Sequence, residues 1–309
     1  MIVTVTLNPA LDKLLTTDNF RLNQMSRAEE IILEPGGKGI NIGYALSVLG
    51  HEVVFMGFVG GRVGDYIEEK LRNFGLTTNF VHLENETRTN IIIVDAQRKT
   101  QTQINEPGPF VRPEEMERLK QNFARTLGYA KMVVIAGSLP PGVDPFHAVE
   151  LVKMAQAKNV PVTINFSEGP FAETIKSHPY LAKPDIRISP TFMGKPMKFK
   201  RKRIEVLKKL TEEASIAMLN LGFESYIASR DEVYEVTAPV CQVASTVRIN
   251  DALLAGAIDA LLEGKGIAEA GRKGMATAMA ITSSLKGEIE SAKDVEVHLD
   301  RVEVRKIET

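Results

Sequence analysis

Strand-like runs rich in β-branched residues alternate with amphipathic helical patterns along most of this chain of 309 residues. This alternation constrains the fold most, because βαβ units form a mostly parallel sheet with helices on both faces. The expected buried strands are residues 3–7, 53–59, 132–136, 160–164 and 216–219, and the expected helices are 39–49, 63–74, 113–126, 146–156 and 202–214. From 251 to 285 the pattern is nearly all helical, with small residues that suit close helix packing.

Two segments interrupt this rhythm. Residues 14–33 and 90–105 alternate apolar and polar side chains with a period of two. That period is typical of antiparallel strands with one covered and one solvated face. We therefore expect a small, half-exposed β-sheet, placed as a lid over a site.

The composition excludes several classes of protein. A formal charge of -1 gives no overall field that would favour nucleic acid or an anionic membrane. The single cysteine, Cys241, excludes an internal disulfide and suits a reducing compartment, and five scattered histidines offer no metal cluster. No apolar run approaches the length of a transmembrane helix, and the N-terminus is typical of a first strand, not a signal peptide. We expect a cytoplasmic protein without metal-ligating residues.

A locally basic stretch lies at residues 195–209, KPMKFKRKRIEVLKK. Such charge runs usually form the solvated face of a helix. The alternative is a contact for nucleic acid or an acidic protein, since cations at a helix N-terminus oppose its dipole. We favour the first interpretation and predict no nucleic-acid partner.

The first constellation with chemical meaning is EPGGKGIN at residues 34–41. Its glycines allow close approach of the backbone to a ligand, and Lys38 offers a point charge for phosphate. A plain turn is the alternative. Dinucleotide binding of the Rossmann type is disfavoured, because the motif follows the lid segment and not the first strand.

The motif, followed by Gly50 and Gly60-Gly61, resembles the first signature of the PfkB-type (ribokinase-like) sugar kinases, with Gly43 as a departure. Further segments resemble the 1-phosphofructokinase and tagatose-6-phosphate kinase branch of that family. They are TLNPALD at 6–12, GFVGGRVGDYIEEKL at 57–71, ETRTNIII at 86–93, INEPGP at 104–109 and GSLPPGV at 137–143.

The resemblance implies a substrate site in the first half of the chain. A carboxylate suits sugar hydroxyls, and Lys or Arg suits a phosphate dianion. The implied substrate residues are Asp12, Gly37, Lys38, Asn41, Arg88, Asn90 and Ser138. Without the resemblance, Asp12 would be read as a turn cap and Arg88 as a solvent-facing charge.

The second half departs from the family pattern. Where the family has D-T-x-G-A-G-D, the chain has S-T-V-R-I-N-D at residues 245–251, which keeps the catalytic base as Asp251. Backbone N–H groups at such a helix start stabilise a transferring phosphoryl group. Arg248 and Asn250 stand where the family has small residues, and the resemblance makes both part of the catalytic segment.

The nucleotide side is also altered. The family's L-G-x-x-G loop is LGFES at residues 221–225, an N-x-x-E motif is missing from 183–195, and NFSEG at 165–169 carries the uncharged Asn165. The resemblance implies ATP and Mg²⁺ as cofactors. The implied nucleotide-binding residues are Asn220, Gly222, Ser225 and Gly256.

The resemblance thus implies a ribokinase-like α/β fold, a single domain over residues 1–309, with a β-lid from about 13–35 and 88–106. The implied reaction is ATP-dependent phosphorylation of fructose 1-phosphate or tagatose 6-phosphate. Asp251 would remove the hydroxyl proton, while Lys38 and Arg88 hold the substrate phosphate. A homodimer through the lid is also implied. The alternative is a catalytically weak or inactive scaffold that binds a phosphosugar as a sensor.

Overall fold

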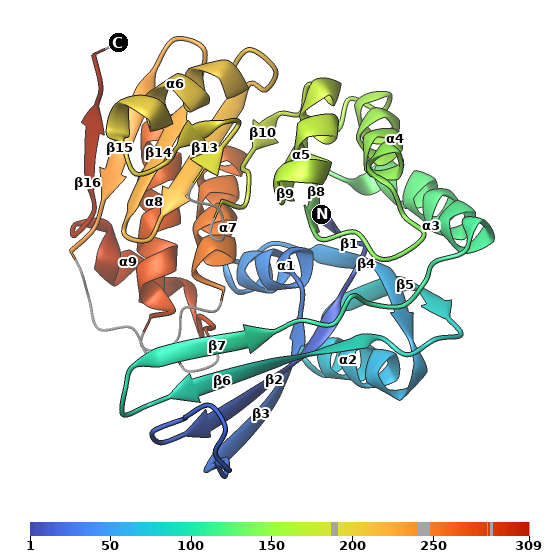
Figure 1. The fold of residues 1–309 in the computed structure, drawn as a ribbon. Helices are drawn as coiled ribbons and strands as arrows, with labels where there is room; N and C mark the ends of the chain where they lie inside the picture. Colours follow the sequence, from blue (N-terminus) through green and yellow to red (C-terminus); the bar gives the residue numbers. More distant parts are fainter. Residues whose placement is uncertain (187–190, 240–247, 283, 285–286, 309) are drawn as a thin grey trace.

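A ten-stranded sheet forms the centre of the computed structural model, which describes residues 1–186, 191–239, 248–282, 284 and 287–308 (Figure 1). In spatial order its strands are β16 (Glu303–Lys306), β15 (Val233–Thr237), β14 (Glu224–Ala228), β13 (Ile216–Leu221), β10 (Leu181–Ala182), β9 (Val162–Phe166), β8 (Met132–Gly137), β1 (Ile2–Thr6), β4 (Val53–Gly60) and β5 (Thr77–Leu83). Pairings from β5 to β13 are parallel, and those from β13 to β16 are antiparallel.

Helices cover both faces of this sheet, as the alternation predicts (Figure 1). One face carries α3 (Pro113–Thr126), α4 (Pro145–Gln156), α5 (Glu168–Thr174) and α6 (Lys200–Leu210), and the other carries α1 (Lys38–Val48), α2 (Gly61–Asn73), α7 (Ile249–Leu262), α8 (Ile267–Ala280) and α9 (Ala292–Leu299). Short 3-10 turns lie at Leu127–Tyr129 and Ile175–Ser177. Alternate strand residues serve the two hydrophobic layers: Val133 packs on the first and Val134 on the second.

Small residues let the helices lie close to their neighbours. A Cβ at Gly256 would stand 2.6 Å from the Lys273 carbonyl oxygen, and one at Gly274 2.6 Å from the Leu253 carbonyl oxygen, so α7 and α8 pack backbone to backbone. Gly43, the departure from the family pattern, has the same role, since its Cβ would meet the Phe55 ring. Within the described ranges, no helix is long and apolar enough to cross a membrane.

A separate four-stranded sheet lies in the segments that the sequence analysis expects to form a lid, and it is called the lid below. Its order is β3 (Glu30–Gly36), β2 (Ala10–Thr17), β6 (Arg88–Asp95) and β7 (Thr100–Ile104). The expectation of antiparallel strands is correct for β2–β3 and β6–β7 but wrong for the central pair, because β2 and β6 run parallel. A period of two fixes which face a side chain occupies but not the direction of the partner strand. A further small pair joins β11 (Thr191–Phe192) and β12 (Lys195–Pro196).

Candidate active site

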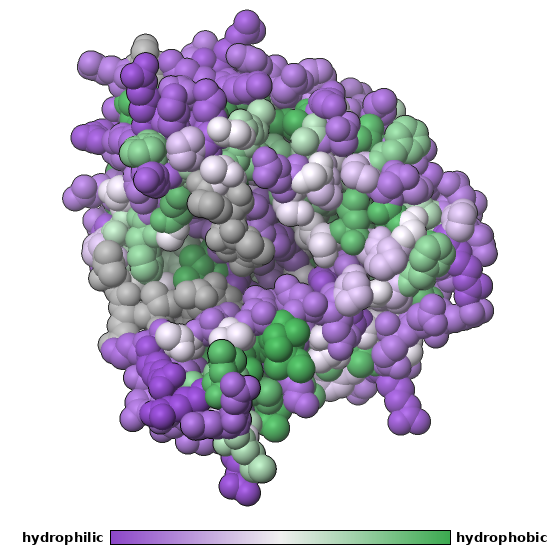
Figure 2. Space-filling model, in the orientation of Figure 1, coloured by the Kyte–Doolittle hydropathy of each residue, from purple (hydrophilic) through white to green (hydrophobic). Residues whose placement is uncertain are grey.

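A cleft of about 640 Å³ lies between the lid and the edge of the large sheet where its parallel strands end. Figure 2 shows the surface hollowed above the lid. This edge is where open α/β sheets bind ligands. All but two of the residues predicted from sequence line the cleft, although they come from six different parts of the chain. They are Asp12, Gly37, Lys38, Asn41, Arg88, Asn90, Ser138, Asn220, Gly222, Arg248, Asn250 and Asp251.

Asp251 lies in the first turn of α7, 3% exposed. Asn41 Nδ2, from α1, donates to its Oδ2 over 2.8 Å. The other carboxylate oxygen, Oδ1, is buried without a hydrogen-bond partner in the described part of the chain. Asp251 therefore presents an available acceptor to the cleft.

Asp12 lies on the cleft-facing side of the lid. Asn90, its register partner on β6, donates from Nδ2 to Asp12 Oδ1 over 2.8 Å. Burial raises the pKa of Asp12, against a smaller lowering effect from the nearby Arg248 guanidinium. The backbone next to it must be glycine, because a Cβ at Gly36 would stand 2.6 Å from Asp12 Oδ1.

Lys38, at the start of α1, has a partner that the sequence analysis missed. Its Nζ lies 2.8 Å from Asp185 Oδ2, with side-chain exposures of 19% and 8%. Asp185 follows the two-residue strand β10. A carboxylate shortly after a strand that ends at the site edge is the signal that could have identified it.

Arg88 is not a solvent-facing charge. Its guanidinium donates to the carbonyl oxygens of Asn8, Pro9 and Glu106 at 2.9–3.3 Å and to Ser138 Oγ at 3.3 Å. Burial lowers its pKa, which the neighbouring Asp12 partly offsets. Arg88 thus ties the base of the lid to the ends of the strands. Asn8, also missed from sequence, lines the cleft there.

Arg248 lines the cleft, but its guanidinium is held by other parts of the protein. Its backbone is left-handed, with φ 68°, immediately before α7. The guanidinium is buried and donates to the Pro35 carbonyl oxygen over 2.8 Å and to Glu288 Oε1 over 2.6 Å. Asn250 accepts a hydrogen bond from Asn220, which links α7 to β13.

Two predicted nucleotide residues lie outside the cleft lining. Ser225 is 1% exposed on β14, opposite Asn220 and Val236. Gly256 lies between α7 and α8, as described above. Both residues are packed against neighbouring elements, and their contact with a nucleotide stays a prediction.

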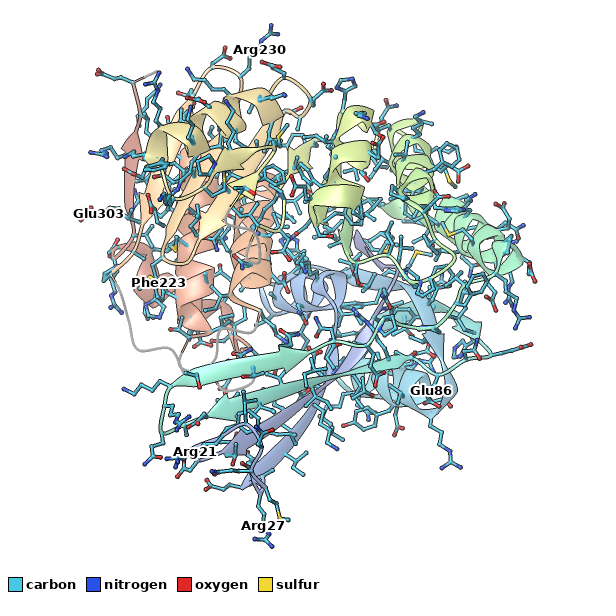
Figure 3. All side chains as sticks on the ribbon, in the orientation of Figure 1. Arg21, Arg27, Glu86, Phe223, Arg230 and Glu303 are labelled. Carbon is cyan, nitrogen blue, oxygen red and sulfur yellow. The ribbon has the colours of Figure 1, made fainter. Side chains whose placement is uncertain are left out.

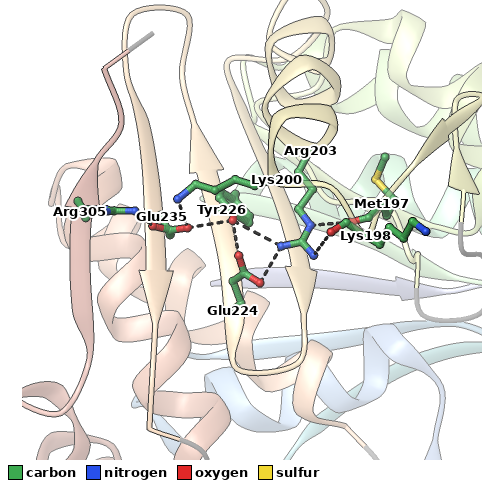
Figure 4. A network of polar contacts seen from close by, with 8 residues as sticks. All are labelled: Met197, Lys198, Lys200, Arg203, Glu224, Tyr226, Glu235 and Arg305. Carbon is green, nitrogen blue, oxygen red and sulfur yellow. Dashed lines mark hydrogen bonds and ion pairs between the residues drawn. The ribbon is translucent and has the colours of Figure 1, made fainter.

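Many basic residues of the stretch 195–209 form ion pairs within the protein (Figure 4). Arg203 is largely buried and pairs with Glu224 at 2.7 Å, and Lys200 pairs with Glu235. Glu205 accepts from Lys202 at 2.9 Å and, on the same carboxylate, from Lys195. Burial and the Glu224 hydrogen bond raise the pKa of Tyr226 in this network. These pairs favour the structural interpretation of the stretch over a nucleic-acid contact.

The acidic side chains of the cleft suit a metal that arrives with a ligand. Among the residues described, no group of three or more His, Cys, Asp or Glu side chains could hold an ion by itself. Asp185 and Asp251 nevertheless line the same cleft. One or two carboxylates are sufficient for Mg²⁺ when phosphates and water complete its octahedron. The donor set therefore fits an ion that a nucleotide carries.

The sequence matches the model of the pfkB family carbohydrate kinases over residues 6–293. A possible 1-phosphofructokinase from Thermotoga maritima is 32% identical with a TM-score of 0.94, over 100% of both chains. A putative phosphofructokinase from Staphylococcus aureus is 24% identical (TM-score 0.81; 100% of this chain, 99% of that one). Phosphofructokinase-2 from Escherichia coli in complex with fructose-6-phosphate is 22% identical (TM-score 0.87; 97% and 98%) and shares the fold. The chain therefore belongs to the pfkB family of carbohydrate kinases.

Proposed function

We propose that the protein is an ATP-dependent kinase that phosphorylates a hexose phosphate, fructose 1-phosphate or tagatose 6-phosphate. The observation that carries the proposal is Asp251: a buried carboxylate at a helix N-terminus, held on one oxygen by Asn41 and unpartnered on the other among the described residues. That oxygen is available to accept the proton of a substrate hydroxyl as it attacks the γ-phosphate.

The start of α7 would stabilise the transferring group. Arg248 is left-handed and the following residues are helical, which makes successive N–H groups point into one concavity. The N–H groups of Asp251 and Ala252 are bound by the Arg248 carbonyl oxygen at 2.9 and 2.8 Å. No partner for the N–H groups of Ile249 and Asn250 lies among the described residues, so both would be offered to an anion at the positive end of the helix.

The substrate would lie across the lid. Asp12 suits the sugar hydroxyls, and its fixed position beside Gly36 and Asn90 orients them. Lys38 and Arg88 supply the positive charge for the substrate phosphate. Lys38 would exchange its Asp185 partner for the phosphate. The Arg88 guanidinium would keep its hydrogen bonds to carbonyl oxygens and contact the phosphate in addition.

The nucleotide would enter beside the β13–β14 turn, where Gly222 with φ 73° lines the cleft. Bound Mg²⁺ would neutralise phosphate charge, with Asp185 and Asp251 as the carboxylates that line the cleft. The hydrogen bond between Asn220 and Asn250 joins this turn to the start of α7. It would fix the nucleotide-binding turn relative to the proton acceptor Asp251.

The outer face of the lid is the proposed homodimer interface. Register places Leu15, Ile31, Leu33, Ile93 and Ile104 on the face opposite Asp12. Ile31 and Ile104 are each 58% exposed. Figure 2 shows hydrophobic side chains gathered on the lid, whereas Figure 3 shows Arg21 and Arg27 at its free end, away from the main sheet. An apolar sheet face of this kind is suited to packing against a second copy.

The test is a coupled assay with ATP, Mg²⁺ and each hexose phosphate, with binding measured in parallel by calorimetry. Asp251→Asn should lower kcat by at least about 10²-fold, because an amide cannot accept the proton, while the hexose phosphate still binds. Equal turnover in the variant would refute Asp251 as the proton acceptor. Binding without turnover in the wild-type protein would instead support a sensor.

A further inference from the structure

We propose that Glu288 is a positioning residue for phosphoryl transfer, which acts by clamping Arg248 so that the start of α7 keeps its anion-binding conformation. This inference rests on the proposed function and extends it to a residue that contacts neither substrate. Glu288 belongs to the segment between α8 and α9 and comes from outside every motif that the sequence analysis identified.

The backbone at position 248 needs an external support. A left-handed conformation is unfavourable for an L-residue other than glycine, asparagine or aspartate, because Cβ crowds the following carbonyl. Arg248 nevertheless has φ 68° and ψ -7°, and its side chain makes no capping hydrogen bond to α7. Such outliers persist where surrounding contacts determine them, and they concentrate at functional sites.

Two contacts supply that support. Glu288 Oε1 accepts from Arg248 Nη1 at 2.6 Å, with side-chain exposures of 15% and 6%, and the Pro35 carbonyl oxygen accepts from Nη2 at 2.8 Å. Pro35 lies near the end of lid strand β3. The guanidinium is therefore fixed between the lid base and the approach to α9. A buried ion pair that loses one partner leaves an uncompensated charge, which then seeks another acceptor.

The position of the proton acceptor depends on this conformation. The Arg248 carbonyl oxygen accepts the N–H groups of Asp251 and Ala252, so a rotation at residue 248 would displace the first turn of α7. Released from Glu288, the guanidinium would also be attracted toward Asp12, because its charge already acts to lower the pKa of that carboxyl group. Both movements would disturb the place where the phosphoryl group is transferred.

The test combines Glu288→Ala with Arg248→Gly. Glu288→Ala alone should lower kcat about tenfold or more, and Glu288→Gln, which keeps an acceptor oxygen, should lower it less. Glycine adopts the left-handed conformation without support. In the Arg248→Gly background, Glu288→Ala should therefore change kcat by less than about twofold, a strong departure from additivity. The matched control is Glu290→Ala, which removes the same charge from an exposed position two residues away.

Two results would overturn the clamp. In the first, Glu288→Ala lowers kcat as much in the Arg248→Gly background as in the wild type; in the second, it lowers kcat in neither background. Crystal structures of Glu288→Ala and of the double variant decide the matter independently of turnover. The clamp requires residue 248 to leave the left-handed region in the first and to remain there in the second. If wild-type protein phosphorylates no hexose phosphate, the proposed function fails, and these structures still support or refute the clamp.

Discussion

Replacing Asp185 by asparagine is expected to tighten the binding of the sugar phosphate. In the structure Asp185 Oδ2 lies 2.8 Å from Lys38 Nζ, within the cleft. In the proposed function, an incoming phosphate dianion takes this lysine from its carboxylate partner while that carboxylate repels the phosphate. Asparagine keeps the size of the side chain and removes the charge, so Lys38 loses its ionic partner and the phosphate is no longer repelled.

The size of the effect follows from the exposure of the pair. Two unit charges about 4 Å apart attract by about 4 kcal/mol at an effective dielectric constant of about 20. The net value is smaller, because exposed pairs contribute about 0–1 kcal/mol, whereas breaking a buried pair costs about 3–5 kcal/mol. Side-chain exposures of 19% for Lys38 and 8% for Asp185 lie between these cases. We expect about 1.4 kcal/mol, or a roughly tenfold lower Kd.

Isothermal titration with fructose 1-phosphate and with fructose separates the charge effect from the shape effect. Only the phosphorylated ligand should gain affinity, and the gain should shrink as salt is added, because screening weakens exposed charge interactions. The control is Asp65→Asn, an exposed aspartate on α2. Unchanged or weaker binding of fructose 1-phosphate by Asp185→Asn would refute the competition, and weaker binding only with Mg²⁺ and nucleotide would make Asp185 a metal-side carboxylate.

Three further outcomes are expected. Gly256→Ala should lower the free energy of unfolding by about 1–3 kcal/mol, because its Cβ would stand 2.6 Å from a backbone oxygen of α8, whereas Gly169→Ala, with open space in α5, should raise it by about 0.5–1 kcal/mol in the same urea titration. Burial raises the pKa of Asp12 above 3.8, so the folded state holds this proton more tightly and stability declines as pH rises from 3.8 through the raised value. Asp12→Asn should therefore be more stable than wild type at neutral pH, lose that advantage as the pH is lowered toward 3.8, and no longer bind the sugar; a pH-independent difference would contradict this reasoning. Ile104→Glu, on the exposed edge strand of the lid, should yield monomers in analytical ultracentrifugation, and an unchanged mass would place the interface elsewhere.

The main architecture could be predicted from sequence, because each buried parallel strand corresponds to a short apolar run between two helical patterns. The expected strand at 132–136 matches β8 at Met132–Gly137, and the expected helix at 113–126 coincides with α3. The antiparallel extension by β14, β15 and β16 was missed. Strand β10, with two residues, is too short to give any periodic signal. The parallel pairing of β2 with β6 depends on which strand becomes the neighbour, and alternation does not encode that choice.

The site could be predicted as far as its chemistry is local. Gly37, Lys38 and Asp251 line the cleft, as the sequence analysis expects; the glycine-rich turn pointed to the first two, and the family resemblance pointed to Asp251. Asp185 and Glu288 were missed, because their importance comes from the partner each meets, and those partners are distant in sequence. The direction of the Arg248 side chain is likewise set by Pro35 and Glu288, which no pattern within 245–251 reveals. The segment 240–247, including Cys241, lies outside the described residues.

The parallel pairing in the lid has a consequence for the order of folding. Asp12 and Asn90 are separated by 78 positions, and the chain between them forms β3, α1, β4, α2 and β5. A parallel pair cannot form as a local hairpin. We therefore expect the intervening elements to fold before β2 pairs with β6. Asp12, the carboxylate proposed to bind the sugar, is thus placed late in folding. In a refolding experiment, recovery of sugar binding should lag behind the return of helical circular dichroism, and the lag should measure the closure of the lid.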